Sequence, residues 1–127
     1  YFMPSAAEAS ALTGEDDAQS AAEVFLTLGA GAVIIKRGPH GAFVAMKRER
    51  FALPAHEVQA IDTTSCGDSF CAGFIAALNR GWTPVDAIKF ATATAALVAQ
   101  GLGTLGALRS FEATEQAMRE MPLRSAS

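Results

Sequence analysis

The sequence predicts an α/β domain, in which helices pack against a sheet of buried strands. The run AVIIK at 32–36 is continuously apolar and rich in β-branched residues, which is typical of a strand buried on both faces. The run AFVAM at 42–46 follows across the tight turn RGPHG, so these two strands are predicted to form a hairpin. Buried strands accompanied by helical segments indicate a layered α/β fold.

Helix signals surround these strands and give the rest of the predicted order. Residues 5–12 begin with a serine, continue with small helix formers and stop before a glycine. Residues 16–28 begin with acids, which suit the positive end of a helix dipole, and stop before two glycines. The elements predicted after the hairpin are short strands at 50–55 and 57–61, helices at 67–80, 84–100 and 110–121, and a glycine-rich loop at 101–107.

Length and composition bound the class of protein. The chain has 127 residues, enough for one modest domain with one core, and half of them are hydrophobic, as in globular proteins. The net charge is −3 with acids and bases interspersed, so no basic patch indicates a nucleic-acid partner. The apolar stretches are too short and too often interrupted to span a membrane, and no segment has the pattern of a secretion signal. We therefore expect neither a nucleic-acid nor a membrane partner.

Cysteine usage points to a reducing compartment. The two cysteines, Cys66 and Cys71, lie five residues apart on one predicted segment. This spacing suits neither a disulfide framework nor a zinc site. Two reduced thiols in a cytoplasmic protein are the simplest interpretation.

The segment DTTSCGDSF at 62–70 places acidic, small and hydroxylated residues directly ahead of an apolar helix. A strand is predicted to end near Ile61 and a helix to begin near Gly67, so the backbone N–H groups of residues 65–68 lie at a helix N-terminus. These N–H groups have no partners inside the helix, and the dipole makes that end electropositive. Because the side chains are small, the segment is a candidate cradle for a phosphate or an oxyanion.

Asp68 is the unexpected member of this cradle, because a phosphate repels a carboxylate. A general base that takes a proton from a hydroxyl attacking the phosphate would sit there. The structural alternative is that Asp68 caps or decorates the first helical turn, where acids are common. Cys66 also has two interpretations. A helix N-terminus can lower the pKa of a thiol, which would make Cys66 reactive. The simpler interpretation is that Cys66 is a small spacer.

The segment DTTSCGDSFCAGF resembles the C-terminal signature of the pfkB-type, ribokinase-like carbohydrate kinases, D-T-x-G-A-G-D-x-F. Ser65 and Cys66 replace Gly-Ala by other small residues, so a backbone cradle is retained. The residues that match the signature are Asp62, Thr63, Gly67, Asp68 and Phe70.

Three further segments resemble motifs of the same family, in the family's order. PSAAEASALTG at 4–14 is similar to P-N-x-x-E-x-x-x-L-T-G, with Ser5 in place of Asn. KRGPHG at 36–41 is similar to the turn K-x-G-x-x-G, and residues 90–107 are similar to the helix and loop that close over the adenine. The resemblance covers about residues 4–107 and implies a ribokinase-like fold, a Rossmann-like three-layer α/β/α arrangement, of which this chain would be the C-terminal half, with the nucleotide-binding and catalytic portion.

The resemblance implies an ATP-dependent kinase that transfers the γ-phosphoryl group to a hydroxyl of a sugar or sugar acid. Asp68 would be the general base, and the N–H groups of Ser65, Cys66 and Gly67 would form the anion hole. Mg²⁺ would offset the phosphate charge, with Glu8 acting through water.

The resemblance also implies nucleotide contacts and a monovalent cation, with K⁺ as the candidate. Structural alternatives remain open for the nucleotide contacts: a solvated strand end for Lys36, a turn that needs positive φ for the glycines after it, and packing for Thr92. The nucleotide-binding positions are Ser5, Lys36, Gly38, Gly41, Gly67 and Thr92. The cation positions are the Asp62 side chain and backbone carbonyls around Thr64, Val98, Gly101 and Gly103.

Members of the family are normally longer, and their sugar contacts and lid are expected to be absent from this chain. Its first residues, YFMPSAAEAS, lack an initiator methionine and have the pattern of a strand, loop and helix already under way, which is expected of a piece of something longer. The competing hypotheses are a nucleotide-binding remnant that is inactive alone, and a kinase for a nucleoside or vitamin precursor. A homodimer is left open.

Overall fold

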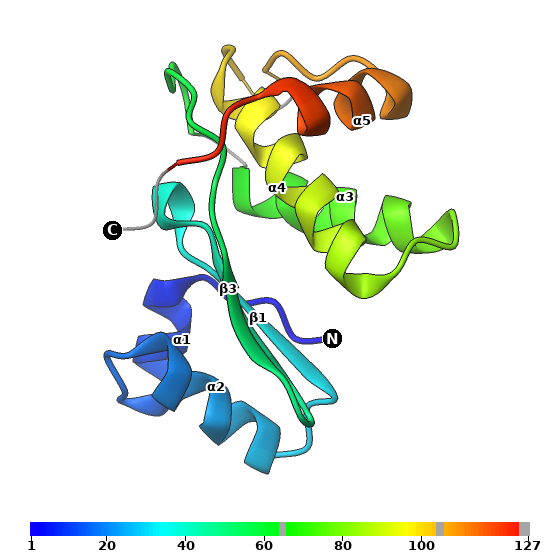
Figure 1. Cartoon of the computed structure of the whole chain (residues 1–127). Helices are drawn as coiled ribbons and strands as arrows, with labels where there is room; N and C mark the ends of the chain where they lie inside the picture. Colours follow the sequence, from blue (N-terminus) through cyan, green and yellow to red (C-terminus); the bar gives the residue numbers. More distant parts are fainter. Residues whose placement is uncertain (64–65, 104–105, 125–127) are drawn as a thin grey trace. The chain divides into compact units, whose positions relative to one another are not determined.

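The structure is a computed structural model that describes residues 1–63, 66–103 and 106–124. Within them the chain divides into two compact units, Tyr1–Pro54 and Ala55–Ser127. The first unit contains the sheet and the second is mainly helical (Figure 1). Both units contain buried apolar residues, such as Ile35 in the first and Phe74 in the second.

The first unit opens with two short helices, α1 (Ala6–Thr13) and α2 (Ala18–Thr27). Both begin at capping side chains, Ser5 for α1 and Asp17 for α2, which accept hydrogen bonds from backbone N–H groups that have no partner inside the helix. Gly14 ends α1 with φ at 76°, in the left-handed region that glycine adopts without steric cost. The two predicted helices are therefore confirmed within a residue or two at each end.

The sheet of the first unit has the strand order β1-β2-β3 and is antiparallel: β1 is Ala32–Lys36, β2 is Ala42–Met46 and β3 is Arg50–Leu53. Ile34 pairs with Val44, and the 3-10 turn η1 (Gly38–His40) joins β1 to β2. The predicted hairpin is confirmed, as is the burial of the AVIIK strand.

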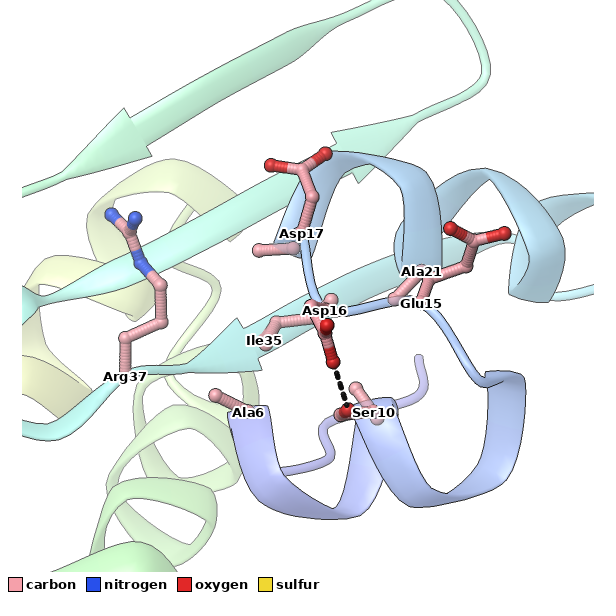
Figure 2. A pocket seen from close by; sticks show the side chains of 10 residues that line it. Ala6, Ser10, Glu15, Asp16, Asp17, Ala21, Ile35 and Arg37 are labelled. Atoms are coloured by element: carbon pink, nitrogen blue, oxygen red, sulfur yellow. Dashed lines mark hydrogen bonds between the residues drawn. The ribbon is translucent and has the colours of Figure 1, made fainter.

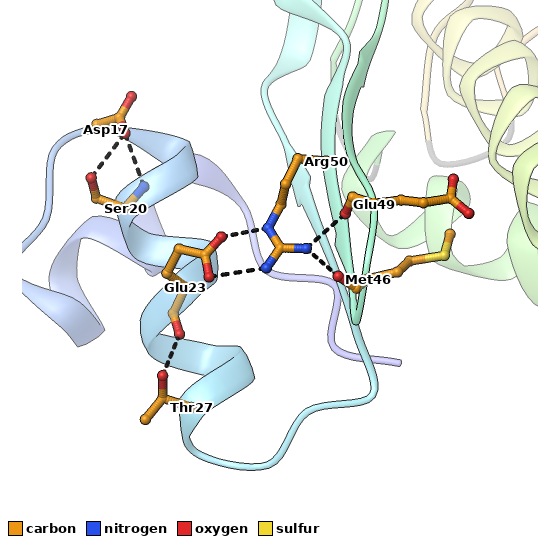
Figure 3. Close-up of polar contacts among 7 residues, drawn as sticks. All are labelled: Asp17, Ser20, Glu23, Thr27, Met46, Glu49 and Arg50. Atoms are coloured by element: carbon orange, nitrogen blue, oxygen red, sulfur yellow. Dashed lines mark hydrogen bonds and ion pairs between the residues drawn. The ribbon is translucent and has the colours of Figure 1, made fainter.

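Helices α1 and α2 cover one face of this sheet (Figure 1). The residues buried between the helices and the sheet are Ala9, Ala21, Ala22, Phe25, Val33, Ile35 and Ala45. Figure 3 shows a polar link between α2 and the β2–β3 connection: the Arg50 guanidinium pairs with both Glu23 carboxylate oxygens and donates to the Glu49 carbonyl at 2.9 Å. The Arg50 hydrogen bond lowers the pKa of Glu23.

The second unit contains α3 (Cys66–Asn79), α4 (Pro84–Ala99) and α5 (Phe111–Glu120). Helix α4 is buried on most of its surface because α3 and α5 both pack against it. The close approach of α3 to α4 requires a glycine at position 73, since a Cβ on Gly73 would lie 2.5 Å from the Thr94 hydroxyl oxygen. The Phe111 ring stacks on Phe90 at 4.2 Å and so ties α5 to α4.

The strand predicted at 57–61 is wrong, because the structure forms no strand there. The Glu57 N–H donates to the Pro122 carbonyl at 2.6 Å and the Ile61 N–H to the Ala99 carbonyl at 2.7 Å. These acceptors belong to two different segments, so a continuous ladder with one neighbouring strand does not form. Alternating polarity in the sequence cannot supply a missing partner strand.

The helices that the structure describes do not meet the requirements of a membrane span. None of them combines enough length with enough hydropathy to cross a bilayer.

Candidate functional site

Asp68 lies in the first turn of α3, where the sequence predicted a general base. It is exposed, and its carboxylate has no hydrogen-bond or ion-pair partner among residues 1–63, 66–103 and 106–124. The described residues thus show no side-chain cap at Asp68, while its exposed position in the first turn matches both the other structural alternative, an acid that only decorates this turn, and the general base. The carboxylate is left open to a reactant at the positive end of a 14-residue helix.

Ser65 of the predicted anion hole and Thr64 of the predicted cation site lie outside the described residues. The Cys66 N–H donates to the Thr63 carbonyl at 3.2 Å, a long hydrogen bond that closes the turn ahead of α3. Gly67 follows in the first turn of α3 and is exposed, so its backbone can be approached from solvent.

The turn ahead of α3 is anchored to the end of α4. The N–H groups of Ile61 and Asp62 both donate to the Ala99 carbonyl, at 2.7 and 3.1 Å. The Asp62 carboxylate accepts the Gly103 N–H at 3.1 Å. The Asp-Thr part of the motif is therefore held by main-chain groups of α4 and of the loop that follows it.

The Cys66 thiol points into the α3–α4 contact. Its Sγ donates to the Ala95 carbonyl at 3.6 Å. Burial, together with the negative charge of Asp62, raises the pKa of the Cys66 thiol. The raised pKa does not match a thiol activated by the helix terminus, and Cys66 fits the simpler interpretation as a small spacer.

The glycine-rich loop after α4 is close-packed at two of its glycines. A Cβ on Gly106, whose φ is 49°, would lie 2.0 Å from the Val98 carbonyl oxygen. A Cβ on Gly101 would lie 2.6 Å from the Gly106 carbonyl carbon. Gly106 therefore packs its backbone against the Val98 carbonyl, one of the predicted cation ligands, which also accepts the Gly101 N–H at 3.4 Å.

The cation ligands predicted in this loop are main-chain carbonyl oxygens and not a cluster of side chains. In the described part of the chain, no group of three or more His, Cys, Asp or Glu side chains is suitably placed to hold a metal ion. A hard monovalent cation takes carbonyl and carboxylate oxygens, so the Asp62 and Val98 positions fit one in chemical type.

Thr92 is buried in α4, with 8% of its surface exposed. Its hydroxyl donates to the Ile88 carbonyl at 2.9 Å, within the same helix. Thr94 bonds to Phe90 in the same way and fills the contact with Gly73. The burial of Thr92 and its hydrogen bond within α4 match the packing alternative.

In the first unit, the structure brings together Ser5, Glu8 and Lys36. The Glu8 carboxylate accepts the Ser5 N–H at 2.8 Å, and the Ser5 hydroxyl accepts the Glu8 N–H at 3.1 Å. A parallel bridge joins Ser5 to Lys36. The hydrogen bonds from Ser5, with a smaller contribution from the Lys36 charge, lower the pKa of Glu8. This capping box was missed from the sequence, although its pattern Ser-x-x-Glu was present at 5–8.

The turn after β1 has the positive φ angles that its glycines suggested. Gly38 has φ at 56° and Gly41 at 85°. The Gly41 N–H donates to the Gly38 carbonyl at 3.0 Å, and the Arg37 N–H to the Gly41 carbonyl at 2.8 Å. The space beside Gly38 is open, since a Cβ there would meet no atom within 4 Å. A tight turn with an approachable backbone is compatible with both interpretations of these glycines.

Arg37 is a further polar feature that the sequence did not single out. With Ile35, it lines a cavity of about 230 Å³ beside α1 and α2. Figure 2 shows the guanidinium on one side of this cavity and the carboxylates of Asp16 and Asp17 on the other. The Arg37 Nε is buried without a hydrogen-bond partner in the described residues. We assign no ligand to this cavity.

The sequence was compared with known protein families and solved structures. The family described as pfkB family carbohydrate kinase matches residues 1–110. A ribokinase of Staphylococcus aureus is 32% identical over 121 residues, which cover 91% of this chain and 40% of that protein. The chain thus spans less than half the length of the curated relatives it matches.

Two solved structures show the likeness in three dimensions. The ribokinase of Thermotoga maritima has a TM-score of 0.86 and 36% identity, covering 93% of this chain and 41% of that one. A protein of Escherichia coli, provisionally named ribokinase II and solved with ATP and Mg²⁺, has a TM-score of 0.84 and 29% identity, covering 92% and 38%. The predicted ribokinase-like fold class is confirmed, with the chain as a part of that fold.

Proposed function

This chain belongs to the pfkB family of carbohydrate kinases, and we propose that it is the nucleotide-binding and catalytic portion of an enzyme that phosphorylates a sugar. The proposed reaction transfers the γ-phosphoryl group of ATP to a hydroxyl of a sugar or sugar acid. The observation that carries the proposal is the exposed Asp68 carboxylate at the N-terminus of α3, with no partner in the described residues.

Asp68 is proposed as the general base. A sugar hydroxyl is a weak nucleophile, and its attack on the γ-phosphorus becomes easier when a carboxylate accepts its proton. An acid engaged in a cap would be less available for this step, so the lack of a partner in the described residues favours the role. The O–P bond to the sugar forms as the bond to ADP breaks, and the proton passes to Asp68.

The start of α3 is proposed to stabilise the charge on the phosphoryl group as it is transferred. Backbone N–H groups at a helix N-terminus and the dipole behind them favour an anion. Gly67 has no side chain that would hinder the approach of an anion to its backbone, and the Cys66 N–H would have to release its long bond to the Thr63 carbonyl. We include Ser65 in the hole on the family resemblance alone.

Nucleotide binding is proposed at the turn Gly38–Gly41, at Lys36 and at Ser5, with Thr92 as a further contact. The open space at Gly38 supports close approach of a ligand to the backbone, and Lys36 supplies a positive charge. Glu8 would hold Mg²⁺ through water, which fits a carboxylate whose lowered pKa keeps it ionised. Bound Mg²⁺ would offset the negative charge of the phosphates.

A K⁺ site is proposed at the Asp62 carboxylate and the carbonyls of Thr64, Val98, Gly101 and Gly103. The oxygen types support it, because carbonyl and carboxylate oxygens are the ligands that a hard cation takes. In this structure, the Asp62 carboxylate binds the Gly103 N–H, which ties two of the proposed positions together.

A second candidate function is nucleotide binding without catalysis. It is favoured by the share of the relatives that the chain spans, 40% of the Staphylococcus aureus ribokinase, because sugar contacts made by the remainder would be missing. A nucleoside or vitamin precursor as acceptor is the other alternative to a sugar.

An acceptor panel distinguishes these proposals. The protein is incubated with MgATP and, in turn, ribose, fructose, 2-keto-3-deoxygluconate and adenosine, and the phosphorylated product is identified by mass spectrometry. Transfer to a sugar or sugar acid supports the proposed function, whereas transfer to adenosine alone replaces it with nucleoside phosphorylation. Binding of ATP without transfer to any acceptor favours the non-catalytic function.

A further inference from the structure

Residues 121–124, here called the C-terminal strap, follow α5 and lie antiparallel to residues 55–57 within the second unit (Figure 1). Two backbone hydrogen bonds join the strap to this segment: Glu57 N–H to the Pro122 carbonyl at 2.6 Å, and Arg124 N–H to the Ala55 carbonyl at 2.8 Å. Because so short a ladder has few bonds, it can open at a lower free energy than the helices of the unit.

His56 lies at the centre of this ladder and pairs with Leu123. The two backbone bonds belong to the neighbours of this pair, so the side chains of His56 and Leu123 lie on the same face. The His56 side chain is buried, with 4% of the residue exposed. Its Nδ1 lies 3.1 Å from the Met121 carbonyl oxygen. Since a carbonyl oxygen can only accept, Nδ1 carries a proton, and Nε2 is the nitrogen that gains one when the ring becomes charged.

A second proton on His56 would place a positive charge beneath the strap. Among residues 1–63, 66–103 and 106–124, no carboxylate forms a hydrogen bond or an ion pair with this ring. The charged residues nearest to it along the paired segments and the end of α5 are all exposed; they are Glu57, Glu120 and Arg124. Burial lowers the pKa of His56 and outweighs the carbonyls of Met121 and Pro122, which raise it.

Opening of the strap would return the His56 ring to water. The open form then takes up a proton near the ordinary pKa of 6.5, whereas the closed form resists it, so acid favours the open form. The contribution of neutral His56 is fully present above that pH and is lost progressively as the pH falls towards the lower pKa of the closed form. We propose that residues 121–124 are an acid-released strap, which stays on residues 55–57 while His56 is neutral and leaves them when His56 is protonated.

The strap holds the segment that leads along the chain to the turn ahead of α3. Residues 55–57 are bonded to the strap, and the next described backbone bond along this segment is that of Ile61 to Ala99. Release would therefore free the main chain ahead of Ile61. The inference goes beyond the proposed function and does not depend on it, because it concerns how the chain is held and would apply equally without catalysis.

Amide exchange at two pH values tests the proposal. The ¹⁵N-labelled chain is followed at about pH 7.5 and about pH 5, and each exchange rate is divided by the intrinsic rate at that pH to give a protection factor. We expect the protection of the Glu57 and Arg124 amides to fall severalfold on acidification, with about tenfold per pH unit as the limit for one titrating group. Amides in the middle of α4 should keep their protection.

Two results of this measurement would overturn the proposal. One is unchanged protection of Glu57 and Arg124 in a chain that stays folded. The other is an equal loss of protection in α4, because the strap would then open only together with the whole unit.

The two histidines of the chain supply a matched pair of variants. His56→Asn keeps an N–H donor on the side chain but cannot take up a proton in this range. His40 is exposed in the turn η1 of the first unit, so His40→Gln removes a histidine away from the strap. We expect His56→Asn to abolish the pH dependence of Arg124 protection and His40→Gln to retain it; the reverse result would contradict the proposal.

The parent chain gives an independent check if His56→Asn does not fold. The carbon-bound ring protons of His56 are titrated by nuclear magnetic resonance, and their midpoint is compared with that of the loss of Arg124 protection. The proposal predicts that the two changes occur over the same pH range. Loss of Arg124 protection while the His56 ring remains neutral would contradict it.

Discussion

Helices α1 and α3 each carry an acid in the first turn, Glu8 and Asp68. Glu8 closes a capping box with Ser5, and these hydrogen bonds lower its pKa. The Asp68 carboxylate is exposed and has no partner in the part of the chain that the structure describes. The same sequence signal therefore accompanies a carboxylate engaged in a capping box in α1 and an exposed carboxylate without such a contact among the described residues in α3.

The largest effect is expected from Asp68→Asn, which tests the chemical side of this comparison. Loss of a general base lowers turnover by about 10²- to 10⁴-fold, while the uncharged amide leaves the fold and nucleotide binding in place. Turnover is measured with the acceptor that the panel identifies, and folding by the melting temperature. Near-normal turnover of Asp68→Asn would show that Asp68 is not the general base. The proposed difference in role between Asp68 and Glu8 would then lose its chemical side.

The next effect concerns the loop that anchors the turn ahead of α3. Gly106→Ala places a Cβ 2.0 Å from the Val98 carbonyl oxygen at a positive φ. We expect it to reduce the free energy of unfolding by about 2–5 kcal/mol, from backbone strain and overpacking together. Gly103→Ala is the matched control, because its φ is also positive but the space around it is open, so only about 1–2 kcal/mol is expected. Urea unfolding measures both, and equal losses would contradict the packing at Gly106.

The cap of α1 tests the structural side of the comparison. Ser5→Ala removes the hydroxyl that accepts the Glu8 N–H and is expected to cost about 0.5–2 kcal/mol of stability. Ser5→Asn restores a strong N-cap and is expected to melt close to the parent chain. The matching position of the family motif is Asn, so Ser5→Asn is also expected to bind MgATP at least as tightly. A Ser5→Ala variant as stable as the parent would show that the capping box contributes little.

The smallest effect is expected from Glu8→Gln and depends on pH. Because the folded-state pKa of Glu8 is lowered from 4.5, the ionised carboxylate contributes stability above that value, which is lost as the pH falls through the folded-state pKa. The parent chain should therefore melt slightly higher than Glu8→Gln at about pH 6, and the difference should close towards about pH 3. Thermal melts across this range measure it, and a gap that widens on acidification would contradict the assignment.

The hairpin and the helices were predictable because their signals are local. The apolar run at 32–36 predicted β1, and the serine that begins residues 5–12 predicted the start of α1. The segment 57–61 was wrongly predicted as a strand, since its alternation says nothing about whether a partner strand is present. For the Cys66 thiol, the sequence revealed the helix terminus but not the burial against α4 that raises the pKa.

The candidate site was predictable as a set of motifs and not as contacts. The position of Asp68 in a first helical turn followed from the sequence, and so did the tight turn at Gly38–Gly41. The bond between Asp62 and Gly103 joins residues 41 positions apart and could not be read from local pattern. The unpaired Arg37 Nε likewise depends on how a helix pair covers the sheet.

The most direct test of the central claim is a nuclear magnetic resonance titration of the ¹⁵N-labelled chain with a non-hydrolysable MgATP analogue. The account predicts saturable shifts of the Gly67 and Asp68 amides, because the first turn of α3 receives the phosphate end of the ligand. It also predicts that the amides of α5, where no contact with the ligand is proposed, respond less. A folded chain whose Gly67 and Asp68 amides do not move, while other amides shift with the ligand, would contradict the account.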